Sequence, residues 1–303
     1  MPDGLLNVLK PPGMTYHDVV DGVRRITRMR KVGHTGTLDP AAAGVMILML
    51  GGATRLAEYL LGCDKTYRAE ITFGLSTDTL DGEGVIVAEA DASGVTEAQV
   101  REGLTGLTGE IEMVPPMHSA VWHEGRRLYE IAREGETVEV ESRQVAVHRF
   151  DLLDFAPGER ARASAEVECS SGTYVRSLAA MLGDALDCPA YLSFLVRTKV
   201  GAQTVADAAT GRELIEAMRE DRLCELLQPP ETVLCDWPTI EADRETAIQL
   251  CRGMQTPAPS LLAPGQHILV KSQGRLLCVA EVVVDGEATL IQPRRVLLSE
   301  DEL

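Results

Sequence analysis

The stretch "VGHTGTLDPAAAGVMILML" (residues 32–50) joins a glycine-rich turn to a long apolar run. Its first nine residues hold two glycines, one histidine and a single carboxylate, Asp39, and they follow the basic run "RRITRMRK" (24–31). Apolar residues at helical spacing predict a helix over about 17–31, and the apolar run after Pro40 is typical of a buried strand. We therefore expect Asp39 to lie in the connection between a basic helix and a buried strand.

Three interpretations of the turn "GHTGTLDP" compete. A phosphate-binding P-loop needs the pattern G-x-x-x-x-G-K-[ST], and this turn has neither the lysine nor that glycine spacing. A structural turn fits, because Gly, Thr, Asp and Pro are common turn residues. A catalytic aspartate needs a cation that keeps it ionised, for which Arg176 is a candidate, and no second carboxylate of a glycosidase pair is evident nearby. Taken alone, the turn favours the structural interpretation.

The distribution of charge leaves room for a nucleic-acid partner. The 303 residues carry a formal net charge of −17, which by itself counts against RNA because phosphate binding needs local positive charge. Residues 10–34, however, hold six Lys or Arg and two Asp, whereas residues 78–103 hold seven Asp or Glu and one Arg. The charge is segregated, so a basic surface is compatible with the acidic total.

Further along the chain, strand and helix patterns alternate. Alternation over 163–169 predicts a strand that turns through "SSGT" into a helix, which places Tyr174 and Arg176 at a helix N-terminus. The prolines of "LQPPETVLCDWP" indicate a boundary near residue 235, and "HILVKSQGRLLCVAEVVVDGEATLIQP" is typical of a small β-barrel or sandwich. The turn-rich "STDTLDGEG" lacks the ligand spacing of a calcium loop, so we expect no metal site.

One segment combines basic and aromatic residues. "MVPPMHSAVWHEGRRLYEIAREG" places Arg126 and Arg127 beside Trp122 and Tyr129. This pattern is compatible with RNA contact, although an ordinary surface helix looks much the same. We expect about 115–140 to be an RNA-contacting insertion.

Five ordered motifs carry a resemblance to a known family. They are "LKPPGMT", "GHTGTLDPAAAGVMILMLGGATRLAEYLL", "DKTYRAEITFG", "VPPMHSA" and "CSSGTYVRSLA", and together they span residues 5 to about 200. In order and spacing they resemble the TruB family of tRNA pseudouridine synthases, whose signature G-H-x-G-x-L-D-P contains the catalytic aspartate. "LCRGMQT" and the strands after it resemble, more weakly, the family's PUA-type RNA-binding module.

The resemblance implies roles for individual residues. Asp39 would be the catalytic nucleophile, Arg176 its ion-pair partner, and Tyr67 the residue that stacks on the target uracil and helps to remove its C5 proton. His34 would sit against the space left by nucleotides flipped out of the T loop, and so bind RNA rather than transfer protons. The other substrate-binding positions that we assign are Lys10, Thr37, Arg126, Arg127, Tyr174 and Leu195.

The resemblance also implies an α+β fold. A mixed, largely antiparallel central sheet flanked by helices (1–235) would precede a small β-rich PUA-like domain (236–303). The enzyme would flip uridine 55 out of the tRNA T loop, cleave its glycosidic bond and re-form the link as a C–C bond, which requires no cofactor, metal or nucleotide. We expect a monomer that binds the T arm.

Three positions depart from the family pattern, namely Tyr16, Val196 and Tyr191, and they concern RNA contact rather than the chemistry. The acidic stretch 236–303 holds ten Asp or Glu against six Lys or Arg, so we expect it to bind RNA weakly or to orient the acceptor stem. The alternatives are an RNA chaperone on the same fold and, ranked low, the catalytic subunit of a guide-RNA complex. Because no apolar segment reaches about 18 residues and no export signal is evident, we expect a cytoplasmic protein.

Overall fold

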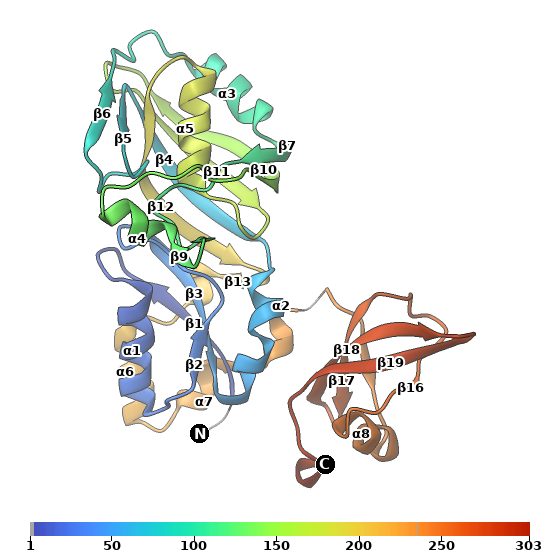
Figure 1. The fold of residues 1–303 in the computed structure, drawn as a ribbon. Helices are drawn as coiled ribbons and strands as arrows, with labels where there is room; N and C mark the ends of the chain where they lie inside the picture. The colour runs from blue at the N-terminus through green and yellow to red at the C-terminus, as the bar shows by residue number, and fades with distance from the viewer. Residues whose placement is uncertain (1–2, 235) are drawn as a thin grey trace.

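The computed structural model describes residues 3–234 and 236–303 (Figure 1). Its larger part is built on one sheet, whose strands are β1 (Gly4–Lys10), β2 (Val32–His34), β3 (Ala43–Leu50), β4 (Lys65–Phe73), β7 (Gly109–Met113), β10 (Arg143–Ala156), β11 (Arg162–Cys169), β12 (Ala190–Val200), β13 (Gln203–Thr204) and β14 (Leu227–Gln228). The main path runs β14-β1-β3-β12-β4-β11-β10-β7, while β13 pairs with β12 and β2 with β3. Only the β3–β12 pair is parallel among these described strands. The expected mixed, largely antiparallel sheet is thereby confirmed.

The helices of this part are α1 (Tyr16–Thr27), η1 (Gly51–Leu56), α2 (Ala57–Leu61), α3 (Glu97–Gly106), α5 (Val175–Ala185), η2 (Val205–Asp207), α6 (Gly211–Arg219), α7 (Leu223–Leu226) and η3 (Pro230–Thr232). α1 begins at a capping box between Thr15 and Asp18 and ends earlier than expected, because Arg28 adopts a left-handed conformation (φ 56°). A left-handed residue is a usual way for a helix to stop. The basic residues 28–31 therefore lie beyond the helix end.

The apolar run of β3 is explained by burial on both faces of the sheet. One core gathers α1 and α6 over β1 and β3, and a second lies on the other side of β3 with η1 and α2. A third core packs α3 and α5 against β4, β10, β11 and β12. A central strand that is covered on both faces needs apolar residues at successive positions, and β3 has them.

Two hairpins extend from the sheet. β5 (Leu75–Thr77) pairs with β6 (Ile86–Glu89), and β8 (Trp122–His123) pairs with β9 (Arg126–Arg127), which leads into α4 (Leu128–Arg133). In Figure 1, α4 and β9 are drawn across the middle of the molecule. Within the residues of the expected insertion, the structure has a two-stranded hairpin and a short helix.

The C-terminal part contains β15 (Thr239–Glu241), α8 (Arg244–Cys251), β16 (Thr256–Pro257), β17 (His267–Ser272), β18 (Arg275–Asp285), β19 (Ala288–Val296) and η4 (Glu300–Glu302). Its strands form one sheet in the order β15-β17-β18-β19-β16, where we expected a barrel or a sandwich. Its own core packs α8 against this sheet. The boundary predicted at residue 235 lies outside the described residues.

Apolar and charged contacts join the two parts. Leu269, Leu276 and Val279 share a core with residues of β3, η1 and α2. Arg295 pairs with Glu58 at 2.7 Å on the same junction. The C-terminal sheet is therefore packed against the larger part (Figure 1).

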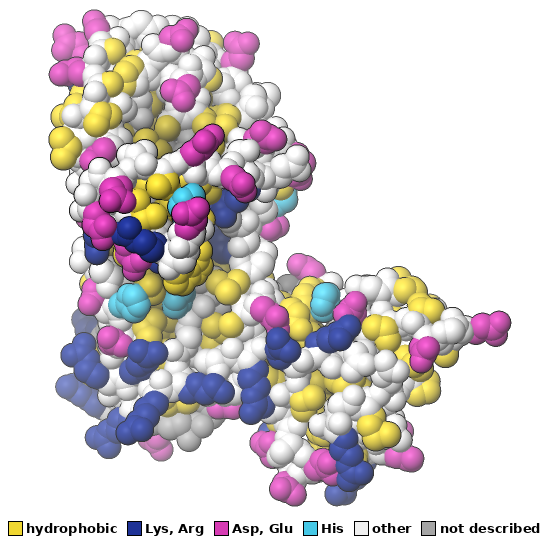
Figure 2. All heavy atoms as spheres, in the orientation of Figure 1, with side chains coloured by type: hydrophobic (Ala, Val, Ile, Leu, Met, Phe, Trp, Pro, Cys, Tyr) yellow, Lys and Arg dark blue, Asp and Glu magenta, His cyan; other side chains and the backbone are white. Residues whose placement is uncertain are grey.

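The surface confirms the segregation of charge. The exposed basic side chains around α1 are Arg24, Arg25, Arg28, Arg30 and Lys31. Figure 2 shows Lys and Arg gathered over this lower region of the molecule and over its junction with the C-terminal sheet, while Asp and Glu dominate the opposite end. None of the helices formed by residues 3–234 and 236–303 is long and apolar enough to cross a membrane.

Candidate active site

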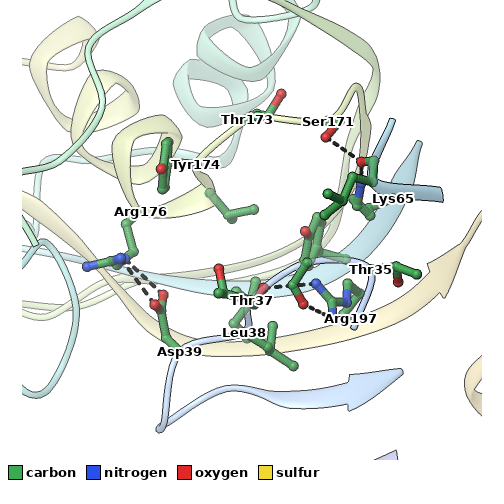
Figure 3. A pocket seen from close by; sticks show the side chains of 16 residues that line it. Thr35, Thr37, Leu38, Asp39, Lys65, Ser171, Thr173, Tyr174, Arg176 and Arg197 are labelled. Atoms are coloured by element: carbon green, nitrogen blue, oxygen red, sulfur yellow. Dashed lines mark hydrogen bonds and ion pairs between the residues drawn. The ribbon is translucent and has the colours of Figure 1, made fainter. Parts of the chain in front are cut away.

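A pocket of about 210 Å³ lies where four segments of the larger part converge (Figure 3). It is bounded by the loop 35–39 before β3, the start of β4, the turn 171–176 into α5, and the middle of β12. These segments are distant in sequence, and the β4–β12 pairing brings two of them together. The pocket therefore depends on the fold of the whole sheet.

Asp39 and Arg176 face each other in this pocket (Figure 3). Arg176 Nε lies 3.0 Å from Asp39 Oδ2, and its Nη2 lies 3.2 Å from Oδ1, so the pair is bidentate. The Arg176 side chain is only 6% exposed, whereas that of Asp39 is 39% exposed and open to the pocket. This geometry holds a carboxylate in one orientation with its free face toward a ligand.

Burial is the main influence on the pKa of Asp39, and it raises it. The Arg176 guanidinium acts in the opposite direction, as does Lys10, while the nearby carboxylate of Asp81 raises the pKa further. Because desolvation disfavours a charged carboxylate and a paired cation favours it, Arg176 is what keeps Asp39 available as an anion.

Asp81 is a second carboxylate at this site, and the sequence analysis missed it. It approaches Arg176 Nη1 at 3.5 Å and is nearly buried. Its Oδ1 accepts hydrogen bonds from Thr79 Oγ1 at 2.6 Å and from the Glu83 backbone N–H at 3.0 Å. The turn-rich stretch "STDTLDGEG" contains Asp81 and could have pointed to this carboxylate, but we considered it only as a calcium loop.

Four more predicted residues line the pocket, namely Thr37, Tyr67, Tyr174 and Leu195. Tyr67 is 8% exposed, and burial raises its pKa. Burial therefore favours the neutral phenol, which can accept one proton while it passes its own on. Tyr174 is the N-cap residue of α5, two positions before Arg176, as the sequence predicted.

Arg197 supports the loop that carries Asp39. Its side chain is buried beneath the pocket, and Nε donates to the Val45 carbonyl at 2.8 Å. Nη1 and Nη2 donate to the carbonyls of Thr37 at 3.1 Å and Gly36 at 3.4 Å (Figure 3). A buried guanidinium that satisfies three backbone acceptors fixes this loop, and no sequence pattern pointed to that role.

Lys10 occupies a different position from the one we expected. It is buried, and its Nζ donates to the carbonyls of Pro11 and Pro40 at 3.0 Å and of Ala42 at 2.6 Å. Burial lowers the pKa of Lys10 to about 8. The structure therefore places this ammonium group behind the Asp39 loop, as a brace, rather than on an RNA-facing surface.

The other three predicted residues lie outside the residues that line this pocket. His34 Nδ1 accepts a hydrogen bond from the Gly36 backbone at 3.2 Å, and its ring lies 4.8 Å from that of Tyr16. Burial lowers the pKa of His34 and favours the neutral ring. Arg126 pairs with Glu134 at 2.7 Å, and the Arg127 guanidinium lies over the Trp122 ring, 3.9 Å from its centroid.

Across residues 3–234 and 236–303, no three His, Cys, Asp or Glu side chains gather in a way that could hold a metal ion. The polar groups of the pocket are instead the Asp39–Arg176 ion pair, several hydroxyls, and the cations Lys65 and Arg197, which donate to backbone carbonyls. Such a site can hold a neutral planar ligand against Tyr67 and Leu195 and present one carboxylate to it.

Comparisons with known proteins agree with the motifs. Residues 24–175 match the TruB family pseudouridylate synthase (N terminal domain). The chain is 53% identical over 252 residues to tRNA pseudouridine synthase B of Symbiobacterium thermophilum, covering 83% of this chain and 82% of that protein. It is 43% identical over 302 residues to tRNA pseudouridine synthase B of Moorella thermoacetica, covering 97% and 99%.

A solved structure shares the fold. A chain of a Cbf5-Nop10-Gar1 complex superposes with a TM-score of 0.78 at 24% identity, covering 99% of this chain and 86% of that one. This similarity extends over the C-terminal sheet as well as the larger part.

Proposed function

We propose that this chain, which belongs to the TruB family and is a tRNA pseudouridine synthase, isomerises uridine 55 in the T loop of its tRNA substrate. Its reaction would break the N1–C1′ bond, rotate the uracil and join C5 to C1′. N1 gains a proton and C5 loses one to water, so atoms and electrons balance without an oxidant, a reductant or a nucleotide.

The observation that carries the proposal is the Asp39–Arg176 pair. Asp39 is open to the pocket, while Arg176 is almost fully buried and holds both carboxylate oxygens. A fixed carboxylate that faces a pocket is the arrangement that nucleophilic catalysis at a sugar or base carbon needs. In this proposal Asp39 attacks the uridine, and Arg176 keeps Asp39 ionised and oriented.

The pocket walls suit an extruded uracil. A flipped base is normally held by stacking against aromatic or apolar side chains, and here Tyr67 and Leu195 come from adjacent strands on one side of the pocket. We assign Tyr67 to stacking and to passing the C5 proton to water, and Thr37, Tyr174 and Leu195 to holding the base. The volume of about 210 Å³ leaves room for one nucleobase.

The surface around α1 supports binding of the tRNA T arm. Its exposed Arg and Lys side chains provide the positive potential that a phosphate backbone requires (Figure 2). We propose that His34, between this surface and the pocket, contacts the opened T loop, and that Arg126 and Arg127 of the insertion (about 115–140) contact RNA across the pocket mouth. Residues 236–303 would be a PUA-like RNA-binding domain, and Lys10 acts by bracing the Asp39 loop. We further propose that the enzyme acts as a monomer in the cytoplasm.

Mapping the product on a tRNA transcript tests the proposal. Carbodiimide labelling followed by primer extension should show one new pseudouridine, at position 55, and a transcript with cytidine at that position should show none. Pseudouridine at another position would refute the assignment of the target. No pseudouridine despite tight tRNA binding would favour an RNA chaperone.

A further inference from the structure

Arg143 is a cation at the rim of the pocket that none of the roles above uses. It is the first residue of β10, where the chain leaves the insertion. Its guanidinium carbon lies 4.9 Å from the centroid of Tyr174, a residue of the pocket wall. The same side chain lines a groove of about 970 Å³ between the insertion and β10, together with Trp122.

The guanidinium of Arg143 has an unused edge. Its Nε and Nη2 atoms are buried without a hydrogen-bond partner, and within the described ranges no carboxylate forms an ion pair with it. Arg176 and Arg197, the other arginines near the pocket, donate to carboxylates or carbonyls from every part of the guanidinium. Unpaired buried donors are costly, so natural structures retain few of them.

The identity of the two atoms indicates the ligand. Nε–H and one Nη2–H point in parallel along one edge of the guanidinium, and this fork matches two oxygens of a phosphate or a carboxylate. The nearest carboxylates on the groove, Glu139 and Glu141, are exposed to water and do not occupy the fork. An RNA substrate brings phosphates to this rim and carries no carboxylates.

We propose that Arg143 binds a phosphodiester of the T loop beside the target uridine, with its Nε/Nη2 edge as the donor pair. The proposal rests on the function proposed above, in that RNA must enter the pocket next to Tyr174. The side chain is only half-buried and lines the groove, and the proposal requires its terminal bonds to rotate so that the edge faces the RNA. Arg143 would then act as a substrate-binding residue that ties the nucleotide backbone to the wall of the uracil pocket.

Binding measurements on Arg143 variants test this role. Arg143→Met keeps an unbranched side chain beside Tyr174 but removes the guanidinium with its charge and donors, and Arg143→Lys keeps only the charge. Arg101→Met is the matched control, because Arg101 is exposed on α3 and already paired with Glu97 at 2.7 Å. All variants are made in an Asp39→Asn background, so that tRNA affinity is measured without turnover. The result then does not depend on whether the parent protein forms pseudouridine.

We expect Arg143→Met to weaken tRNA binding about 10-fold and to reduce the slope of log Kd against log salt by about 0.7–0.9, the loss of one phosphate contact. Arg143→Lys should retain the salt slope but recover only part of the affinity, and Arg101→Met should match the parent. An unchanged salt slope in Arg143→Met, with only a lower melting temperature, would show that Arg143 merely packs on Tyr174 and would overturn the proposal.

Neutral linkages then locate the phosphate. Single methylphosphonates are placed along a T-arm oligonucleotide, each on a 2′-O-methyl nucleotide, with the 2′-O-methyl phosphodiester as its control. One linkage should weaken binding about 10-fold with Arg143 present and have no effect in Arg143→Met. If replacing a guanine by 7-deazaguanine weakened binding in place of a methylphosphonate, Arg143 would contact a base, which would contradict the phosphate assignment. The assignment would also be contradicted if no methylphosphonate had an effect that depends on Arg143.

Discussion

Replacing Asp81 with Asn removes one of the two carboxylates that hold Arg176. Asp81 Oδ2 lies 3.5 Å from Arg176 Nη1, and Arg176 is bound to Asp39 at 3.0 Å on its other side. Arg176 and Asp81 are both largely buried, so solvent screens their attraction little. Asp81→Asn should therefore loosen the Arg176 guanidinium, which orients Asp39. Asp81 itself does not contact the substrate in this account.

The size of the effect follows from the geometry. Opposite unit charges 3.5 Å apart attract by about 5 kcal/mol at an effective dielectric constant of about 20. Arg176 keeps Asp39 and two carbonyl acceptors in the variant, and Asn is still an acceptor, so only part of this attraction is lost. We expect a loss of about 1.5–3 kcal/mol, the range for hydrogen bonds to charged groups, which corresponds to a decrease in kcat of about 10- to 150-fold.

The assay is single-turnover and steady-state tritium release from tRNA labelled at uridine C5. We expect kcat to fall while the Kd for tRNA stays within about 3-fold, because Asp81 orients a catalytic pair rather than RNA. Asp78→Asn is the control, since Asp78 lies on the same turn, is exposed and accepts a hydrogen bond from the Val85 backbone N–H. An unchanged kcat, or a loss confined to tRNA affinity, would refute the reasoning.

The pH profile adds a second readout. Asp39 acts as an anion, so activity is lost as pH falls through its pKa, which burial raises. The charge of Asp81 raises this pKa further, and its removal stabilises the anion. In Asp81→Asn the acid limb of kcat should therefore shift to lower pH even though the maximum falls. A shift to higher pH would show that loosening Arg176 outweighs the lost repulsion.

Three further predictions concern the support of the site. Gly44→Ala should lower the free energy of unfolding by more than about 3 kcal/mol in urea, because Gly44 has φ +116° and an added Cβ would meet the Arg197 carbonyl oxygen at 2.1 Å. The control is Gly22→Ala in α1, which has open space around it and should be neutral or slightly stabilising. The folded protein releases the Lys10 proton at about pH 8, whereas the unfolded chain releases it at about pH 10.4, so the free energy of unfolding should rise between these pH values by up to about 3 kcal/mol. Lys10→Met should abolish this rise, as measured by urea unfolding. An equal pH dependence in the variant would contradict the buried position of Lys10. Tyr67→Phe should retain tRNA affinity and slow tritium release by at least about 100-fold, as expected for a lost proton-transfer group, and unchanged release would limit Tyr67 to stacking.

Local sequence patterns predicted much of the fold. The apolar run of β3 and the turn that puts Arg176 at the start of α5 depend on neighbouring residues, and the structure has both. The order and spacing of five motifs identified the family of the chain, and no single motif would have been specific enough to do so. The end of α1 was placed too late, because the left-handed conformation of Arg28 is not encoded by a Gly or Pro.

The support of the site could not be predicted in the same way. Asp81 and Arg197 reach the pocket through strand pairing and turns that are formed by residues far from Asp39 in sequence. Lys10 was assigned to substrate binding, and only the three carbonyls around its ammonium group reveal a brace. Long-range hydrogen bonds to backbone carbonyls leave no periodicity in the sequence, so they become evident only in the folded chain.

The most direct test of the central claim is Asp39→Asn, assayed for tRNA affinity and for pseudouridine formation on the same preparation. The variant keeps the shape and one oxygen of the side chain but cannot act as a carboxylate nucleophile. We expect tRNA to bind within about 3-fold of the parent Kd and turnover to fall by at least about 1,000-fold. Asp39→Asn with the turnover of the parent enzyme would contradict the assignment of Asp39 as the nucleophile.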